Sequence, residues 1–109
     1  MALTHYILDG HTPVPLRDIL YWSGWMQTTS RRVARTEMAH DVSVSTVFLG
    51  LDHAFGGGPP LLFETMVFGG PLDQEQVRYA TWDEADAGHV RLCALVRQAL
   101  SASDTPTEA

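Results

Sequence analysis

Residues 42–70 read VSVSTVFLGLDHAFGGGPPLLFETMVFGG, two apolar runs separated by a loop of glycine and proline. In each run, over residues 42–51 and 61–68, apolar side chains occupy both of the alternating positions of an extended chain. This pattern is typical of strands that are covered on both sides for much of their length. The sequence therefore predicts two strands of one sheet, and we expect the other segments to pack around them.

Other segments also have the pattern of strands. Residues 32–39 alternate charged with small or apolar side chains, which predicts a half-exposed strand that forms an antiparallel hairpin with the run from residue 42. Residues 5–8 and 12–14 flank an Asp-Gly turn and predict a short hairpin, whose second strand carries prolines and must lie at an edge. Residues 77–80 predict one more short strand.

Two segments have the pattern of helices. Between residues 16 and 26, apolar side chains recur at spacings of three and four, which predicts an amphipathic helix. Thr81 and Glu84 have the spacing of a capping box, which predicts the start of a second helix. This second helix is expected to run to about Ala102 and to carry His89 on its apolar face.

Together these elements predict an α+β fold, an antiparallel sheet of about four to five strands with two helices packed on it. A chain of 109 residues, 45% of them hydrophobic, can form one core but not two, so we expect a single domain over residues 1–102 and a disordered tail over 103–109. The longest apolar run falls well short of the roughly 20 residues that a membrane helix needs. Without a basic leader before an apolar stretch, the sequence predicts a cytoplasmic protein that has no membrane span.

The charges favour some classes of partner over others. The net charge is −6, and all seven basic residues are arginines, so the overall field repels polyanions and argues against general nucleic-acid binding. The basic cluster consists of Arg31, Arg32 and Arg35, and the acidic cluster of Asp83, Glu84 and Asp86. Such clusters are commonly solvated surface, and the alternative is a patch that binds a partner.

Two tryptophans provide a further candidate surface. Trp22 and Trp25 are three residues apart on the first predicted helix and therefore share a face. They form a candidate aromatic ridge for a partner, and the alternative is that they pack into the core. We take both tryptophans, with the basic and the acidic cluster, as candidate partner-binding residues.

A different candidate is a small-ligand, anion or metal site around the glycine-rich loop. Gly56, Gly57 and Gly58 can offer unobstructed amide groups to an anion, although no helix follows them and the Lys and Ser or Thr of a nucleotide-binding loop are missing. The side chains that could join the loop after folding belong to Asp52, His53, Glu64 and His89. No ligand motif such as HExxH is present, and the alternatives are a shaped connection between strands and a hydrogen-bonded core histidine.

Three residues have structural interpretations. Glu64 is the one charge in an apolar strand, and an arginine from residues 32–39 is its expected ion-pair partner. Cys93 is the single cysteine and lies in mid-helix, which predicts a buried thiol rather than a nucleophile. Gly88 is expected to let another backbone approach the second helix. Since neither GxSxG nor another catalytic motif occurs, the sequence favours a protein that is not an enzyme and needs no cofactor.

Three stretches resemble a group of small proteins encoded by bacteriophages and by bacterial genomes with prophage content. They are HYILDGHTPVP at residues 5–15, the whole of residues 41–70, and RYATWDEADAGH at residues 78–89. The resemblance assigns no activity, cofactor or catalytic residue. What it implies is a phage or prophage context, in which small acidic proteins often bind a host or phage macromolecule, and anti-defence proteins are one such class.

The leading hypothesis is therefore a small non-enzymatic phage or prophage accessory protein that binds a host or phage protein. In one version it also binds a second copy of itself, through a sheet edge or through the tryptophan helix. The alternative is the small-ligand, anion or metal site at the glycine-rich loop. The two hypotheses differ in geometry, because the second requires its side chains to converge in one concave pocket.

Overall fold

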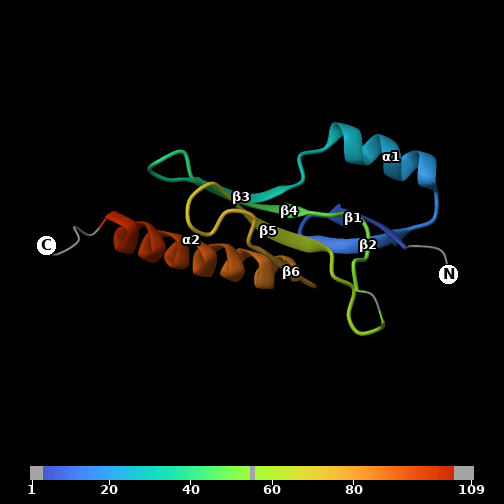
Figure 1. The fold of residues 1–109 in the computed structure, drawn as a ribbon. Coiled ribbons are helices and arrows are strands. Elements are labelled where there is room, and N and C mark those ends of the chain that lie inside the picture. The colour runs from blue at the N-terminus through green and yellow to red at the C-terminus, as the bar shows by residue number, and fades with distance from the viewer. Residues whose placement is uncertain (1–3, 55, 105–109) are drawn as a thin grey trace, which may run out of the picture.

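The computed structural model describes residues 4–54 and 56–104 and has an α+β fold (Figure 1). Its elements in chain order are β1 (His5–Asp9), β2 (Thr12–Leu16), α1 (Ile19–Thr28), β3 (Arg32–Glu37), β4 (Ser43–Phe48), β5 (Phe63–Phe68), β6 (Gln76–Tyr79) and α2 (Trp82–Asp104). Each strand and each helix expected from the sequence is present, and the predicted fold class is confirmed.

The strands form two sheets. β3, β4, β5 and β6 follow one another as a four-stranded antiparallel meander, and β1 and β2 pair as a separate hairpin. The hairpin meets the meander just beyond the end of β4, where His5 pairs with Leu51 and the Tyr6 N–H group donates to the Gly50 carbonyl over 2.8 Å. The predicted sheet of four to five strands thus corresponds to the meander, and the N-terminal hairpin stands apart from it.

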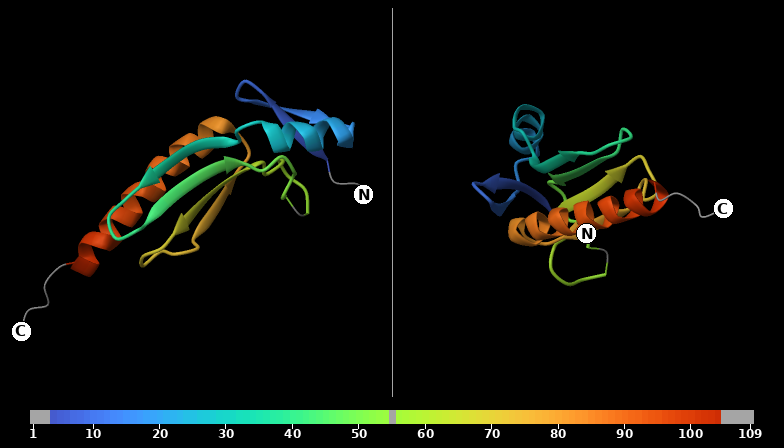
Figure 2. Two further views of the ribbon diagram at one scale, coloured as in Figure 1. Left: turned by 90° about the horizontal axis from the view of Figure 1, so that it is seen from above. Right: turned by 90° about the vertical axis from the view of Figure 1, so that its left-hand side faces the viewer.

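α2 lies along one face of the meander and covers it (Figure 2). The side chains between helix and sheet form two core clusters. One consists of Val42, Val44, Val67, Leu92, Cys93 and Val96, and the other of Phe48, Leu62, Phe63, Tyr79 and Ala85. Cys93 is buried, as predicted. We call the opposite side of the meander, which faces away from α2, the open face.

α1 begins at Ile19, later than expected, because Asp18 caps it. The Asp18 carboxylate accepts hydrogen bonds from the backbone N–H groups of Leu20 and Tyr21, each at 3.1 Å. Leu16, where the apolar spacing begins, belongs to β2. α1 packs mainly against β1, beyond the end of the meander (Figure 1).

α2 begins at the predicted cap. Thr81 Oγ1 accepts the N–H group of Glu84 over 3.1 Å and donates to the Glu84 carboxylate over 3.0 Å. The helix runs to Asp104, so residues 103 and 104 of the predicted tail are helical, and residues 105–109 of that tail lie outside the described residues. Gly88 is buried against the side chain of Tyr79, so its close neighbour is an aromatic ring and not the backbone that was expected.

Candidate functional site

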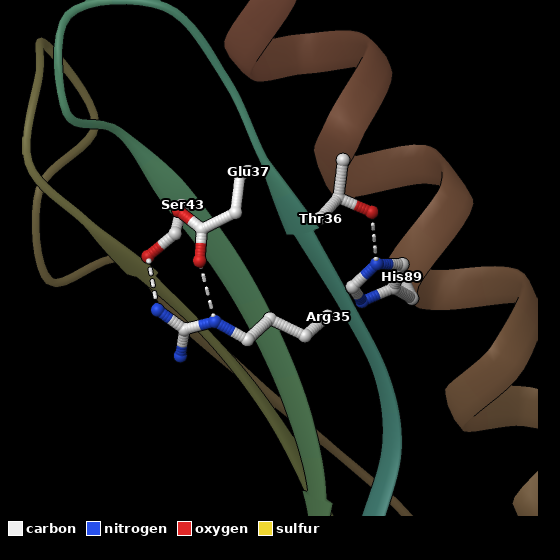
Figure 3. Close-up of polar contacts among 5 residues, drawn as sticks. All are labelled: Arg35, Thr36, Glu37, Ser43 and His89. Carbon is white, nitrogen blue, oxygen red and sulfur yellow. Dashed lines mark hydrogen bonds and ion pairs between the residues drawn. The ribbon is translucent and has the colours of Figure 1, made fainter.

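His89 is the centre of a buried chain of hydrogen bonds between α2 and the meander. Its Nδ1 atom lies 2.7 Å from Thr46 Oγ1. Its Nε2 atom lies 2.9 Å from Thr36 Oγ1, as Figure 3 shows. Thr46 Oγ1 is in turn 2.6 Å from Thr65 Oγ1, to which the Tyr79 hydroxyl group donates over 3.0 Å. The five side chains come from α2 and from all four strands of the meander, so the chain of bonds crosses the whole sheet.

This order of donors suits a neutral imidazole. Tyr79 donates to Thr65, and if Thr65 donates to Thr46 and Thr46 donates to Nδ1, then Nε2 carries the ring proton and donates to Thr36. In this arrangement, a second proton on Nδ1 would face the proton that Thr46 donates. Burial lowers the pKa of His89 below its usual 6.5, and the carboxylate of Asp86 partly offsets this effect.

The His89 chain of hydrogen bonds has a structural role. The His89 residue is 5% exposed, and Thr46 and Thr65 are fully buried, so a ligand has no access to these polar atoms. Both ring nitrogens are also engaged with hydroxyl groups. A satisfied polar network of this kind fixes how a helix sits on a sheet, since every shift breaks several bonds. This arrangement is the hydrogen-bonded core histidine that the sequence left open as an alternative.

Acid should destabilise the protein through His89. Because the imidazole has a lower pKa in the folded protein than in the unfolded chain, its contribution to stability is complete above about pH 6.5 and is lost as the pH falls through the lowered pKa. We expect the free energy of unfolding in urea to fall as the pH is lowered below about 6.5, and to fall less in the His89→Gln variant, which does not titrate. The same pH dependence in both proteins would contradict this expectation.

Asp52 and His53 lie where the chain leaves β4 and enters the glycine-rich loop. Asp52 Oδ1 accepts hydrogen bonds from the N–H groups of Ala54, at 2.7 Å, and of Leu61, at 3.0 Å. The backbone N–H of His53 donates to the Leu61 carbonyl over 3.0 Å. These bonds close the base of the loop, so the Asp52 carboxylate joins the two sides of a connection between strands.

The glycine-rich loop projects from the end of the meander (Figure 1). Gly56, Gly57 and Gly58 are exposed and have φ angles of 103°, 98° and 88°. Glycine adopts these left-handed values without strain, whereas other residues do so rarely. Phe55, which precedes the glycines, lies outside the described residues. The positive φ angles thus account for glycine at residues 56, 57 and 58.

The structure does not bring Glu64 and His89 together, since they lie on opposite sides of the sheet. Glu64 lies on the open face of β5, and its carboxylate pairs with Arg78, the residue directly across on β6, over 3.0 Å. The predicted ion pair between Glu64 and an arginine of β3 is therefore wrong, because β3 does not neighbour β5. Among residues 4–54 and 56–104, no group of three or more His, Cys, Asp or Glu side chains could hold a metal ion.

The two tryptophans of α1 serve mainly to attach the helix. The Trp22 Nε1–H group lies 3.1 Å from the carbonyl oxygen of Tyr6 and 3.2 Å from that of Gly50. Trp25 contacts Phe48 edge to face, with ring centroids 5.8 Å apart. Both indoles are half-buried, so core packing, the alternative that the sequence left open, accounts for a large part of their surface.

The three arginines of the basic cluster lie at the open face, and each makes different contacts. Arg35 Nε pairs with the carboxylate of Glu37 over 2.7 Å (Figure 3). Arg31 is half-buried and donates from its guanidinium group to the carbonyl of Phe48 over 3.2 Å. Within the part of the chain that the structure describes, the exposed side chain of Arg32 makes neither an ion pair nor a hydrogen bond.

The acidic cluster occupies the first turns of α2, and all three side chains are exposed. Glu84 takes part in the helix cap. Asp83 follows Trp82, whose indole stacks on the His11 ring at a centroid distance of 3.7 Å. The cluster therefore marks the place where α2 begins beside the β1–β2 hairpin.

The exposure of apolar side chains on α1 was not predicted from the sequence. Ile19, Leu20 and Tyr21 are 55%, 82% and 59% exposed, and none of the residues of α1 is buried. Two signals were available. Asp18 is a good helix cap and fixes the start of the helix at Ile19, and the ten residues that follow contain no charge.

Comparison of the chain with protein-family models, with curated proteins and with solved structures finds no match. In the described part of the chain, neither helix combines the length and the apolar character needed to cross a membrane.

Proposed function

We propose that the protein is a small non-enzymatic accessory protein of a phage or prophage and that it binds a host or phage protein through α1. The observation that carries this proposal is the exposure of an uncharged, largely apolar helix. The resemblance of three stretches of the sequence to small phage and prophage proteins supports the same function. Such proteins commonly act by occupying a surface of another macromolecule.

α1 has the composition of a helix that is buried on all sides, yet part of its surface is exposed. A helix that is apolar around most of its circumference is normally buried on all sides. Here Trp22 and Trp25 attach one side to the rest of the molecule, while Leu20 on another side is 82% exposed. An exposed apolar surface of this kind typically marks an interaction site.

The outer side of α1 also has a suitable shape. A groove of about 390 Å³ is lined by Leu20, Tyr21, Gly24, Trp25 and Thr28. We call it the α1 groove. Nothing lies within 4 Å of the position that a Cβ atom of Gly24 would take, so the groove has room for an apolar side chain of a partner. Aromatic side chains around such a groove are typical of the residues that dominate binding energy.

Replacing Leu20 with aspartate should abolish partner binding while the protein stays folded. A charge in the lining of the α1 groove would have to be desolvated on binding, and we expect the affinity to fall at least about tenfold. The tagged wild-type and Leu20→Asp proteins are used to capture partners from a lysate of the bacterium that carries the gene. The partner identified by mass spectrometry is then titrated with each purified protein by calorimetry.

The matched control is Val90→Asp, which places the same charge on an apolar residue of α2 that is 65% exposed. It should bind the partner as the wild type does. Light scattering after size exclusion tests whether the protein instead forms a dimer through α1. If the wild type is a dimer and Leu20→Asp is a monomer, a second copy of the chain occupies the α1 groove. If Leu20→Asp captures the same partner with the same affinity as the wild type, the proposal fails.

A further inference from the structure

A polar cavity lies between the end of α1 and the open face of the meander, separate from the α1 groove. Its volume is about 400 Å³. The charged and hydroxyl-bearing residues of its lining are Thr29, Ser30, Arg31, Arg32 and Ser45, and the lining includes no acidic residue. The lining therefore includes two arginines and three residues that carry hydroxyl groups.

Arg31 is held in place at this cavity by reciprocal hydrogen bonds with one residue. The N–H group of Phe48 donates to the Arg31 carbonyl over 2.8 Å, and the Arg31 guanidinium group donates to the Phe48 carbonyl over 3.2 Å. That bond occupies one N–H of a group that has several more donors. A guanidinium group fixed in this way loses less conformational entropy when it binds a ligand.

A β-bulge turns Arg32 to the same side of the sheet. In a regular strand, residues three apart, such as Arg32 and Arg35, point to opposite faces. The register of β3 against β4 shifts between Arg32 and Ala34, so Arg32 lies opposite Val47 and Arg35 lies opposite Ser45. Val47 and Ser45 are two residues apart and share a face, and both arginines therefore lie on the open face. Bulges commonly redirect a side chain in this manner.

The charge of this cavity is not neutralised within the described residues. The nearby carboxylates are engaged elsewhere, Glu37 with Arg35 and Glu64 with Arg78. The C-terminal end of α1 also lies beside the cavity, but its dipole amounts to about half a negative charge against the two full positive charges. On a chain with a net charge of −6, the cavity is thus a local site that attracts anions.

We propose that this cavity binds the phosphate group of a small organic phosphate. Guanidinium groups match phosphate oxygens with paired hydrogen bonds, and the three hydroxyl groups add more donors than the two oxygens of a carboxylate would use. The volume exceeds that of a single phosphate group, and Met26 and Val47 supply an apolar wall for an organic portion. This site stands independently of the function proposed for α1.

This site can be tested by titrating the purified full chain with pyrophosphate at constant ionic strength. Binding is monitored through the amide chemical shifts in NMR spectra. We expect saturable shifts centred on Ser30, Arg32 and Ser45. Arg32→Gln should weaken binding at least about tenfold, since a hydrogen bond to a charged group is lost. Acetate, the carboxylate probe, should bind more weakly than pyrophosphate.

Arg97→Gln is the matched control, because it removes the same charge from an exposed arginine of α2. It should bind pyrophosphate as the wild type does. Equal losses in Arg97→Gln and Arg32→Gln, shifts that do not saturate, or equal binding of acetate would each overturn the proposal. Leu20→Asp should retain pyrophosphate binding, so failure of the α1 groove and failure of this cavity can be told apart.

Discussion

Replacing Phe48 with alanine should lower the free energy of unfolding by about 3–5 kcal/mol. Phe48 is fully buried, and its ring packs against Phe63 and Trp25 with centroid distances of 5.3 Å and 5.8 Å. The substitution would leave a cavity between α1, β4 and β5, and these separate elements cannot all move to close it. Urea unfolding followed by tryptophan fluorescence measures the loss.

Val90→Ala is the control for this experiment. Val90 is 65% exposed, so its truncation should change the free energy of unfolding by no more than about 0.5 kcal/mol. A second consequence concerns α1, which reaches the meander through the contact of Trp25 with Phe48. Amide hydrogen exchange in α1 should therefore accelerate in Phe48→Ala. A loss of stability below about 1 kcal/mol would mean that Phe48 does not join these elements.

The meander and α2 are predictable from the sequence because their signals are local. The alternation of side chains over residues 42–51 and 61–68 indicates strands, and neighbouring strands with short connections usually pair. The pair Thr81 and Glu84 marks the first turn of α2 at the residues where the structure has it. Each of these features depends on a few neighbouring residues.

α1 and the N-terminal hairpin are harder to predict because distant segments decide their placement. The apolar spacing begins at Leu16, yet Leu16 pairs with His5 in the hairpin. The orientation of Trp22 depends on the carbonyl groups of Tyr6 and Gly50, which are 16 and 28 residues away along the chain. No periodicity within the helix contains that information, so the apolar spacing alone does not show which side of α1 is exposed.

The roles of the candidate site residues are also hard to predict from the sequence, because they too depend on distant segments. The partner of Glu64 follows from the register of β5 and β6, which places Arg78 directly opposite it. The face of Arg32 follows from a bulge that simple alternation does not reveal. The role of His89 follows from the meeting of α2 with the strands of the meander. In all three cases the residue type suggested chemistry, and contacts with other elements of the fold decided the role of the side chain.

Gly88→Ala should lower the free energy of unfolding by about 2 kcal/mol, although alanine is the better helix former. A Cβ atom at this residue would overlap the ring and the hydroxyl group of Tyr79. Tyr79 is 5% exposed and donates to Thr65, so moving its ring breaks one end of the His89 chain of hydrogen bonds. Overpacking and the lost hydrogen bond should outweigh the gain in helix propensity, which is about 1 kcal/mol.

Gly24→Ala is the control, because it makes the same substitution in a helix where the added Cβ atom meets no neighbouring side chain. Gly24 lies in α1, and nothing within 4 Å would meet an added Cβ atom, so alanine should raise the free energy of unfolding by up to about 1 kcal/mol. Urea unfolding followed by circular dichroism compares both variants with the wild type. Opposite signs would show that the ring of Tyr79, rather than backbone conformation, requires glycine at residue 88. If both variants are more stable, Tyr79 has room to move, and its bond to Thr65 does not help to position α2 on the sheet.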